Sequence, residues 1–503
     1  MKLFTRSSKY RGRPEDETYP FGRLLAYGTQ HILTMYGGVI APPLIVGGAA
    51  GLSAADTALL VTAGLFLSGI ATLLQTLGLG PLGSRLPIVQ GISFASVSTM
   101  VAIASESGVR PVFGAILVAG LIGLVASSFF AQLVRLFPAV VTGTIITVIG
   151  LSLMPVAFTW AQGGDGADDF GSMTNIGYAG LTLLIILVIS RLFQGAISRL
   201  SILIGLVIGT VIATLTGEAD FSGVATADII ALPPILHFGS PTFEVGAIVS
   251  MTIVIVVIMI ETTADILAIG EIVGTEVDTK RVAGGLRADM GATAVAPLFG
   301  TFPCSAFAQN VGLVALTGIT SRFAVAVGGG VLMLLGLLPV VGAVVAAIPY
   351  PVLGGAGIVL FGSVAASGIR TLARVHYQDN LNMVIVSVSM AVGIIPIAAP
   401  GFWEAFPDWL GVVMHSGISA TAVVAVVLNL LFNELTSGNR KGPSVFEAAE
   451  SSIDQFGDTL DDDLPDGEAR DHGPPRADPT PDTPPSTETG PDARQRRTGE
   501  KRT

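Results

Sequence analysis

Residues 302–318 read Phe302-Pro-Cys-Ser-Ala-Phe-Ala-Gln-Asn-Val-Gly-Leu-Val-Ala-Leu-Thr-Gly318, an apolar run interrupted by polar residues. The run opens close to a proline and carries Gln309, Asn310 and Thr317. In the hydrocarbon of a bilayer an unpaired polar group costs several kcal/mol, so irregular polar backbone persists only where protein buries it or where it lines a cavity. The stretch therefore predicts a broken membrane span that belongs to a transport site.

The composition of the whole chain indicates an integral membrane protein. Of the 503 residues, 51% are hydrophobic and only 13% are charged, whereas a typical soluble domain carries about 25% charged residues. The single cysteine, Cys304, excludes an intrachain disulfide and a cysteine metal cluster, and we expect neither a metal nor a cofactor. A net charge of −11 without a basic patch argues against nucleic-acid binding.

Hydropathy divides the chain into about fourteen transmembrane segments. Each apolar run has about 20 residues, which is enough to span a bilayer as a helix. The predicted spans are 22–48, 55–79, 86–105, 111–133, 137–160, 174–194, 199–216, 244–270, 281–300, 303–319, 322–348, 351–369, 380–400 and 410–434. We therefore predict an all-α polytopic membrane protein.

The polar ends and the loop charges predict how the chain is oriented. Residues 1–21 form a polar, basic lead, and residues 436–503 form an acidic, proline-rich tail whose lack of apolar periodicity is typical of disorder. With the N-terminus inside, the inner loops carry Arg and Lys, and the outer loops carry Asp and Glu apart from Arg110. This positive-inside pattern places both termini in the cytoplasm of a plasma-membrane protein.

The third and tenth predicted spans look like copies of one another. The third reads Leu86-Pro-Ile-Val-Gln-Gly-Ile-Ser-Phe-Ala95, and like the 302–318 run it starts near a proline and interrupts apolar residues with Gln and Gly. Seven spans in each half invert the second copy relative to the first. Paired broken spans at matching places of inverted halves point to the binding site of a transporter, where free helix N-termini face the middle of the membrane.

Two carboxylates lie inside the predicted eighth span. Glu261 and Asp265 are four residues apart and therefore share one helix face. Intramembrane carboxylates are functional candidates, because lipid does not tolerate them uncompensated. We expect at least one of the pair to bind and release a proton, as proton coupling requires. A structural hydrogen bond to a neighbouring broken helix is the alternative.

Other polar residues inside the predicted spans have two interpretations. Asp289, in the ninth span, is either linked to the proton pathway or has a structural role, as a pair with Arg287 or as a cap near the helix end. His31, in the first span, is expected to tie helices together more than to bind substrate.

Four residues of the 302–318 run have separate expected roles. The Gln309 side chain has donors and acceptors suited to a planar amide, so it is a candidate substrate contact. Asn310 and Thr317 are expected to hold helices in place, and Gly312 to allow close backbone approach.

The run also resembles a family signature. Gln309-Asn-Val-Gly312 followed by Thr317-Gly318 matches the pattern Gln/Glu/Pro-Asn-x-Gly-x-x-x-x-Thr-Arg/Lys/Gly of the nucleobase–ascorbate transporters, also called the nucleobase:cation symporter-2 family. Three further segments resemble microbial xanthine and uric acid permeases of that family: Gln30-His-Ile-Leu-Thr-Met-Tyr36, Leu74-Gln-Thr-Leu-Gly78 and Leu86-Pro-Ile-Val-Gln-Gly91. The resemblance covers residues from about 22 to 434.

The resemblance implies a fold of two inverted seven-helix repeats. A core domain would comprise 22–133 and 244–348, and a gate domain, which also makes a homodimer contact, would comprise 137–216 and 351–434. Substrate would bind between the broken spans. The implied contacts are Glu261, Gln309 with its neighbour Asn310, and the backbone around Ser93, Phe94 and Ala95. Asp289 and His31 match family positions as well.

The sequence therefore predicts a proton-coupled symporter of xanthine and/or uric acid that works by alternating access. In the family, Glu at the position of Gln309 accompanies uracil transport, so Gln309 favours the oxidised purines. A uracil or other nucleobase transporter, a sodium-coupled one, or an anion exchanger of the same architecture are the near alternatives. An intramembrane enzyme is disfavoured, because the predicted spans lack an aspartate cluster that could hold magnesium and diphosphate. A scaffold or receptor that binds without transporting is the remaining alternative.

Overall fold

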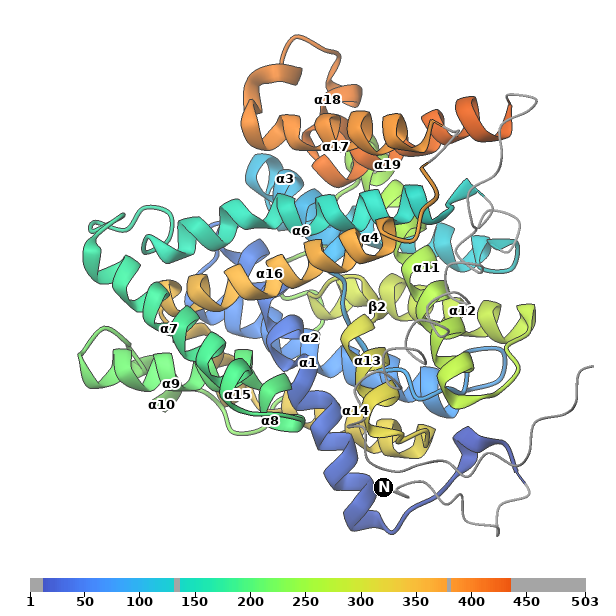
Figure 1. The fold of residues 1–503 in the computed structure, drawn as a ribbon. Coiled ribbons are helices and arrows are strands. Elements are labelled where there is room, and N and C mark those ends of the chain that lie inside the picture. The colour runs from blue at the N-terminus through green and yellow to red at the C-terminus, as the bar shows by residue number, and fades with distance from the viewer. Residues whose placement is uncertain (1–11, 131–135, 378–380, 436–503) are drawn as a thin grey trace, which may run out of the picture. The chain divides into compact units, whose positions relative to one another are not determined.

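The described part of the chain is built almost entirely from helices (Figure 1). The computed structural model describes residues 12–130, 136–377 and 381–435. The tail predicted to be disordered and the first eleven residues of the lead lie outside the described residues.

The elements of the two halves have the following bounds. The first half contains η1 Pro14–Asp16, α1 Phe21–Ala49, α2 Ala54–Leu77, β1 Gln90–Ile92, η2 Phe94–Ser96, α3 Val97–Ser107, α4 Val109–Ala126, α6 Ala139–Ala161, α7 Met173–Leu192, α8 Ala196–Arg199, α9 Ser201–Leu215 and α10 Ser222–Ala225. The second half contains α11 Val245–Val273, α12 Thr279–Val295, η4 Ala296–Phe299, β2 Cys304–Ala306, α13 Ala308–Thr317, α14 Arg322–Gly336, α15 Pro339–Ala346, α16 Tyr350–Leu372, α17 Asn382–Ala398, η5 Pro400–Trp403, α18 Asp408–His415, α19 Gly417–Asn429 and η6 Leu430–Glu434.

Eight of the described helices are long and apolar enough to cross a membrane. The number is nine if α14 and α15, which are bent by 78° relative to each other, form one span. Helices α9 and α17 are apolar but shorter. Each predicted span overlaps at least one of the observed elements, while the predicted count of fourteen crossings stays a prediction.

The helix contacts of one half mirror those of the other. Helix α2 packs against α14 as α12 packs against α4, and α1 packs against α14 as α11 packs against α4. The pair α7–α16 corresponds in the same way to α17–α6, while α6 and α16 pack against each other. If each helix is replaced by its counterpart in the other half, this set of contacts stays the same, as two structural repeats require.

Glycines let the mirrored helices approach closely. A Cβ added at Gly28 of α1 would lie 2.6 Å from the carbonyl oxygen of Ala324 and 2.6 Å from the backbone nitrogen of Gly328 in α14. A Cβ added at Gly150 of α6 would lie 2.3 Å from the backbone nitrogen of Ala365 in α16. Larger residues would push these helices apart, which is why small residues favour helix packing in membranes.

Extended segments interrupt the third and tenth predicted spans. Strands β1 and β2 pair antiparallel, with Gln90 opposite Ala306, Gly91 opposite Ser305 and Ile92 opposite Cys304. The ladder continues at both ends, because the Ser93 N–H donates to the Pro303 carbonyl at 2.9 Å and the Phe307 N–H donates to the Val89 carbonyl at 3.2 Å. In the part of the chain that the structure describes, these two short strands depart from the all-helical prediction, and they satisfy backbone groups that the membrane interior could not.

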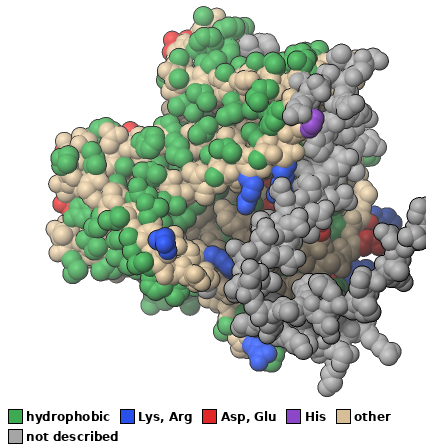
Figure 2. All heavy atoms as spheres, viewed as in Figure 1, with side chains coloured by type: hydrophobic (Ala, Val, Ile, Leu, Met, Phe, Trp, Pro, Cys, Tyr) green, Lys and Arg blue, Asp and Glu red, His purple; other side chains and the backbone are tan. Residues whose placement is uncertain are grey.

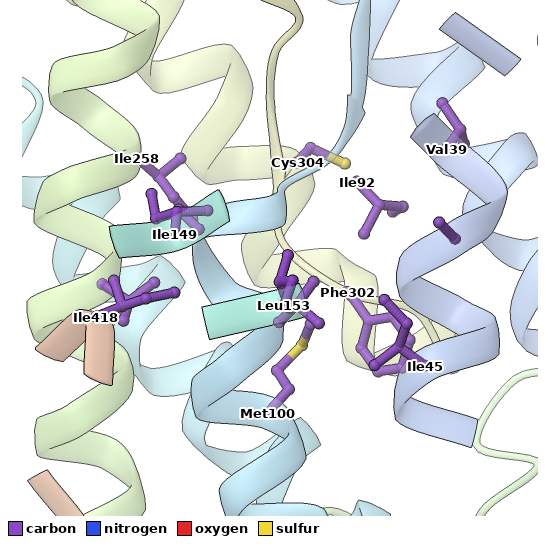
Figure 3. Packing of buried hydrophobic residues seen from close by; sticks show 14 of the residues in the cluster. Val39, Ile45, Ile92, Met100, Ile149, Leu153, Ile258, Phe302, Cys304 and Ile418 are labelled. Carbon is purple, nitrogen blue, oxygen red and sulfur yellow. The ribbon is translucent and has the colours of Figure 1, made fainter. Parts of the chain in front are cut away.

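The strand crossing lies within the hydrophobic core. Ile92 and Cys304 are buried, and Figure 3 shows them close together where the two strands pass. Val39 of α1 lies on one side of this crossing and Ile258 of α11 on the other. The crossing is therefore held between the first helix of each repeat.

One face of the molecule is covered by hydrophobic side chains (Figure 2). Of the long apolar helices that the structure describes, α7 is the most exposed, since only 28% of its most apolar 18 residues are buried within the protein. Met173 and Leu192, at its two ends, are 83% and 69% exposed. Apolar surface of this extent is what a membrane protein presents to lipid.

Candidate substrate-binding site

The two broken spans meet next to α11, the helix that carries the predicted carboxylates. Helix α11 contacts β2, α13 and η2. Its Thr262 side chain accepts a hydrogen bond from the Ala306 N–H at 3.2 Å, and on α12 the Thr293 side chain accepts one from the Cys304 N–H at 3.1 Å. Strand β2 is thus fastened to both helices.

Glu261 and Asp265 keep their carboxylates free for other partners. Both side chains are partly exposed, although they lie midway along α11. Among the described residues, neither carboxylate accepts a hydrogen bond or forms an ion pair. An unpaired carboxylate inside a membrane span is costly unless a ligand or a proton compensates it, so these two are suited to bind either.

Helix α13 presents Gln309 and free backbone donors at its N-terminus. Ala308 and Gln309 are exposed, and in the described part of the chain the Gln309 side chain has no hydrogen-bond partner. The residue before the helix, Phe307, provides no side-chain cap. The first N–H groups of a helix that no cap satisfies can bind carbonyl oxygens or anions. Gln309 and these N–H groups therefore form a polar surface beside α11.

The predicted contact around Ser93, Phe94 and Ala95 reduces to Phe94 in this conformation. Ser93 and Ala95 are buried, and the Ala95 N–H already donates to the Ser93 side chain at 3.3 Å. Phe94 is partly exposed, and its ring lies 6.4 Å from that of Phe307 and 6.1 Å from that of Phe361. Such aromatic surfaces can stack a planar ligand.

Asp289 has a structural partner other than Arg287. The Thr262 hydroxyl donates to Asp289 at 2.6 Å, while the Arg287 guanidinium donates to Ser128 at 3.0 Å. The Asp289 side chain is fully buried within α12. The expected alternative of an Arg287 pair or of a helix cap is therefore wrong, and Asp289 connects through Thr262 to strand β2.

His31 and Asn310 tie the first helix to the broken spans. The Nδ1 atom of His31 hydrogen-bonds the Asn310 side-chain oxygen, so this nitrogen carries the proton. The Asn310 amide donates to the Pro87 carbonyl at 3.3 Å. Both side chains are buried. Each therefore holds elements together, as expected for His31.

Thr317 and Gly312 do less than the sequence predicts. The Thr317 hydroxyl donates to the Leu313 carbonyl at 2.7 Å, one turn back in its own helix, so among the described residues it links no second helix. A Cβ added at Gly312 would meet no atom within 4 Å. The expected close approach of backbone at Gly312 is therefore absent in this conformation.

Sequence reasoning missed two residues that shape the site. Thr262 joins Asp289 to strand β2, but its position beside Thr263 in a helix does not distinguish it. The Phe307 ring fills the space between two glycines: added Cβ atoms at Gly38 and Gly91 would lie 2.7 Å and 2.4 Å from it. The two glycines, one in the first predicted span and one in the third, were the available signal for a large side chain against both.

Comparisons with known proteins identify the relatives of this arrangement. The sequence model described as "Permease family", which represents the nucleobase–ascorbate transporter family, matches residues 22–402. The xanthine permease of Bacillus subtilis (strain 168) is 40% identical over 423 residues, which cover 84% of this chain and 96% of that protein. The uric acid transporter UacT of Escherichia coli (strain K12) is 39% identical over 434 residues, which cover 85% and 90%.

A solved structure shares the fold. The transmembrane domain of the cyanobacterial bicarbonate transporter BicA superposes with a TM-score of 0.55 at 17% sequence identity, covering 82% of this chain and 99% of that one. The two share the architecture of two inverted repeats. At this level of identity the likeness concerns the fold alone.

Proposed function

This chain belongs to the nucleobase–ascorbate transporter family, and from that premise we propose that it is a proton-coupled symporter of xanthine and/or uric acid. It is a membrane permease and not an enzyme. One observation carries the choice of site: Glu261 on α11 and Gln309 on α13 have no partner among the described residues and lie beside the uncapped N-terminus of α13.

The chemistry of an oxidised purine fits these groups. Xanthine and urate present ring N–H donors and carbonyl acceptors in one plane. The Glu261 carboxylate accepts N–H bonds, and the Gln309 amide accepts one bond while donating another to a carbonyl. A base that removes either group from water without pairing it is rejected, because the unpaired group keeps its desolvation cost. Phe94 of η2, an element in contact with α11, supplies an aromatic surface.

The free carboxylates support the proposal of proton coupling. Asp265 lies one turn from Glu261 on the same helix, and neither has a cationic partner among the described residues. Asp289, held by Thr262, connects this helix face to strand β2. After substrate release, the carboxylates would carry uncompensated negative charge inside the membrane. One proton shared by them would compensate part of that charge.

Alternating access is supported by the unequal packing of the two broken spans. In α3 the residues Thr99 and Met100 are buried, and the Thr99 hydroxyl lies 2.6 Å from that of Ser416, which precedes α19. In the matching helix α13, Gln309 and Leu316 are exposed. We propose that a core of 22–133 and 244–348 moves against a gate of 137–216 and 351–434, and that this conformation is open on the side of α13.

The orientation and the assembly are part of the proposal. Arg322 begins α14 directly after the connector from α13, and the positive-inside rule places basic residues at such span ends in the cytoplasm. The open side is therefore cytoplasmic, with both termini on that side of the plasma membrane. A homodimer held through the gate completes the proposal.

An uptake panel tests the function. Cells that express the chain are given radiolabelled xanthine alone, or with an excess of unlabelled urate, uracil, adenine or bicarbonate. We expect xanthine and urate to compete and the others not to. Competition by uracil alone would indicate a pyrimidine transporter, and inhibition by bicarbonate would indicate an anion exchanger.

The same assay tests coupling. Uptake should collapse when a protonophore is added and should persist when choline replaces sodium. Uptake that resists the protonophore and requires sodium would reverse the assignment of the coupling ion. Binding of xanthine by purified protein without uptake into vesicles would instead support a receptor.

A further inference from the structure

The short helix η1 of the N-terminal lead is fixed to the protein by two ion pairs. Glu15 pairs with Arg281 at 2.5 Å, and Asp16 pairs with Arg322 at 2.6 Å. The Glu15 side chain is only 1% exposed. Carboxylates are almost never buried to this extent unless they are paired. The lead is therefore built into the structure at this point and does not lie loosely on its surface.

Arg281 links Glu15 to the first repeat through hydrogen bonds. Its guanidinium donates to the Ser84 carbonyl at 2.7 Å and to the Arg85 carbonyl at 3.0 Å, while it also donates to Glu15. Thr275 adds a bond to the Glu15 carboxylate at 3.2 Å. The planar fork of five donors in arginine can bridge several acceptors at once, which a lysine cannot do.

Arg322 does the same for Asp16. Its guanidinium donates to Asp16 and, at 2.9 Å, to the Thr76 carbonyl at the end of α2. Its neighbour Ser321 donates to the Glu17 carbonyl at 2.5 Å. Arg281 and Arg322 thus join the lead, the second repeat and the first repeat in one connected network.

The network sits on the connectors of the elements that form the candidate site. Ser84 and Arg85 lie in the connector that leads into β1. Thr275 and Arg281 lie at the connection of α11, which carries Glu261, with α12. Arg322 begins α14, directly after the connector from α13. In the described chain, the side chains that hydrogen-bond or form ion pairs with residues 14–17 all lie in the proposed core or in the lead itself.

We propose that Glu15, Asp16, Arg281 and Arg322 form an inner brace that positions the two broken spans and α11 as one rigid unit during transport. The inference rests on the proposed function, since it concerns the movement of the core past the gate. The brace touches no substrate and acts through the connectors, so these four are positioning residues. Losing the brace should slow the movement of the loaded core, while the binding groups keep their chemistry.

The test separates binding from turnover in the full-length protein. Purified Glu15→Gln and Arg281→Gln variants are reconstituted into vesicles, where xanthine exchange needs no ion gradient, and xanthine binding is measured on the same preparations. We expect exchange to slow on the order of tenfold, while Kd changes by less than about twofold. The double variant should be no slower than the slower single variant, because both changes remove one shared contact.

Two matched variants control for charge and for position. Glu17→Gln removes a carboxylate from the same lead, but among the described residues that carboxylate accepts a hydrogen bond only from Tyr19, two residues away. Arg85→Gln removes a cation from the same connector, yet only the Arg85 carbonyl takes part in the brace among the described residues. Both controls should exchange xanthine within about twofold of the unmodified protein.

A second measurement keeps the inference testable without transport. Hydrogen exchange of the backbone amides at 84–92 and 302–310 should accelerate in Glu15→Gln and Arg281→Gln, and should not change in the controls. Brace variants that exchange xanthine at the unmodified rate, or that lose binding in proportion to rate, would overturn the proposal. If the unmodified protein neither binds nor exchanges xanthine, the proposed substrate fails, and the amide measurement still decides the brace.

Discussion

Polar side chains inside the spans divide into those that hold the protein together and those left free. Asp289, His31 and Asn310 are buried and each hydrogen-bonds another element, although Oδ1 of Asp289 and Nε2 of His31 have no partner in the described chain. Glu261 and Gln309 have no such partner among the described residues and retain exposure. A group already satisfied by protein gains little from a ligand, whereas an unsatisfied one gains a full hydrogen bond. The division therefore assigns ligand contact to Glu261 and Gln309.

Replacing the carboxylate of Glu261 tests this assignment directly. Glu261→Gln keeps the size of the side chain but removes the charge and one acceptor, so an N–H group of the base meets an amide donor in one rotamer. A hydrogen bond to a charged group contributes about 1.5–3 kcal/mol, so xanthine affinity should fall by roughly 10- to 150-fold. Glu276→Gln, on the exposed connector after the same helix, is the control. Uptake at the unmodified rate in Glu261→Gln would remove Glu261 from the site.

The side chain at position 309 should set the choice of base. Gln309→Glu replaces a group that donates and accepts with one that only accepts, so a purine carbonyl loses its donor and faces a negative charge. The unpaired carbonyl should cost about 1–3 kcal/mol, which weakens xanthine binding by roughly 5- to 150-fold. Inhibition of uptake by uracil should rise relative to xanthine. An unchanged ratio of the two inhibition constants would show that position 309 does not select the base.

At the scale of the element, the sequence was enough to locate both broken spans but not to pair them. Proline, glutamine and glycine within apolar runs predict irregular backbone, and strands β1 and β2 lie inside the two segments so identified. Their antiparallel register depends on side chains of α2, α11 and α12 that hold each strand, and local patterns do not record it. Hydropathy could locate the helices because the length of an apolar run is a local property, which the sequence does record.

The roles of neighbouring threonines show the same limit. Thr263 donates back to the Met259 carbonyl of its own helix at 2.7 Å, whereas Thr262 joins Asp289 and the Ala306 N–H. Both follow Glu261 directly, and only the direction in which each side chain leaves the helix separates them. Asp289 could therefore be recognised as important from the sequence, while the residue that holds it could not.

Thr262 should be required for its hydroxyl and not for its shape. Thr262→Val is nearly isosteric but leaves the Asp289 carboxylate and the Ala306 N–H without this partner, at a cost of about 1–3 kcal/mol for each buried group. We expect a clear loss of thermal stability and of uptake. Thr262→Ser keeps the hydroxyl and should retain most of both. Equal stability of the valine and serine variants, measured by thermal unfolding in detergent, would contradict a hydrogen-bonding role for Thr262.

At the scale of the whole molecule, two repeats with mirrored helix contacts pack their broken spans unequally. Helix α3 is buried against α19, and the His415 and Glu106 side chains approach within 3.5 Å near its far end. The matching helix α13 is buried on one side, and most of its other residues are exposed. In this conformation one broken span is closed and the other is open. If the two repeats exchanged these roles, the protein would be open on the other side of the membrane, as alternating access requires.

A reversible cross-link between α3 and the start of α19 should therefore stop transport. The Thr99 and Ser416 hydroxyl oxygens are 2.6 Å apart, so cysteines at these positions can form a disulfide with little movement. After oxidation, Thr99→Cys/Ser416→Cys should lose at least about nine-tenths of its xanthine uptake, because the core can no longer leave the gate on that side. Binding of xanthine by the oxidised protein in detergent should persist, since the α13 side stays open.

Each single cysteine variant, beside the buried native Cys304, should be indifferent to oxidant, and a reductant should restore uptake in the double variant. Full uptake by protein shown to be cross-linked would mean that α3 and α19 do not separate during transport, and the assignment of core and gate would have to be redrawn.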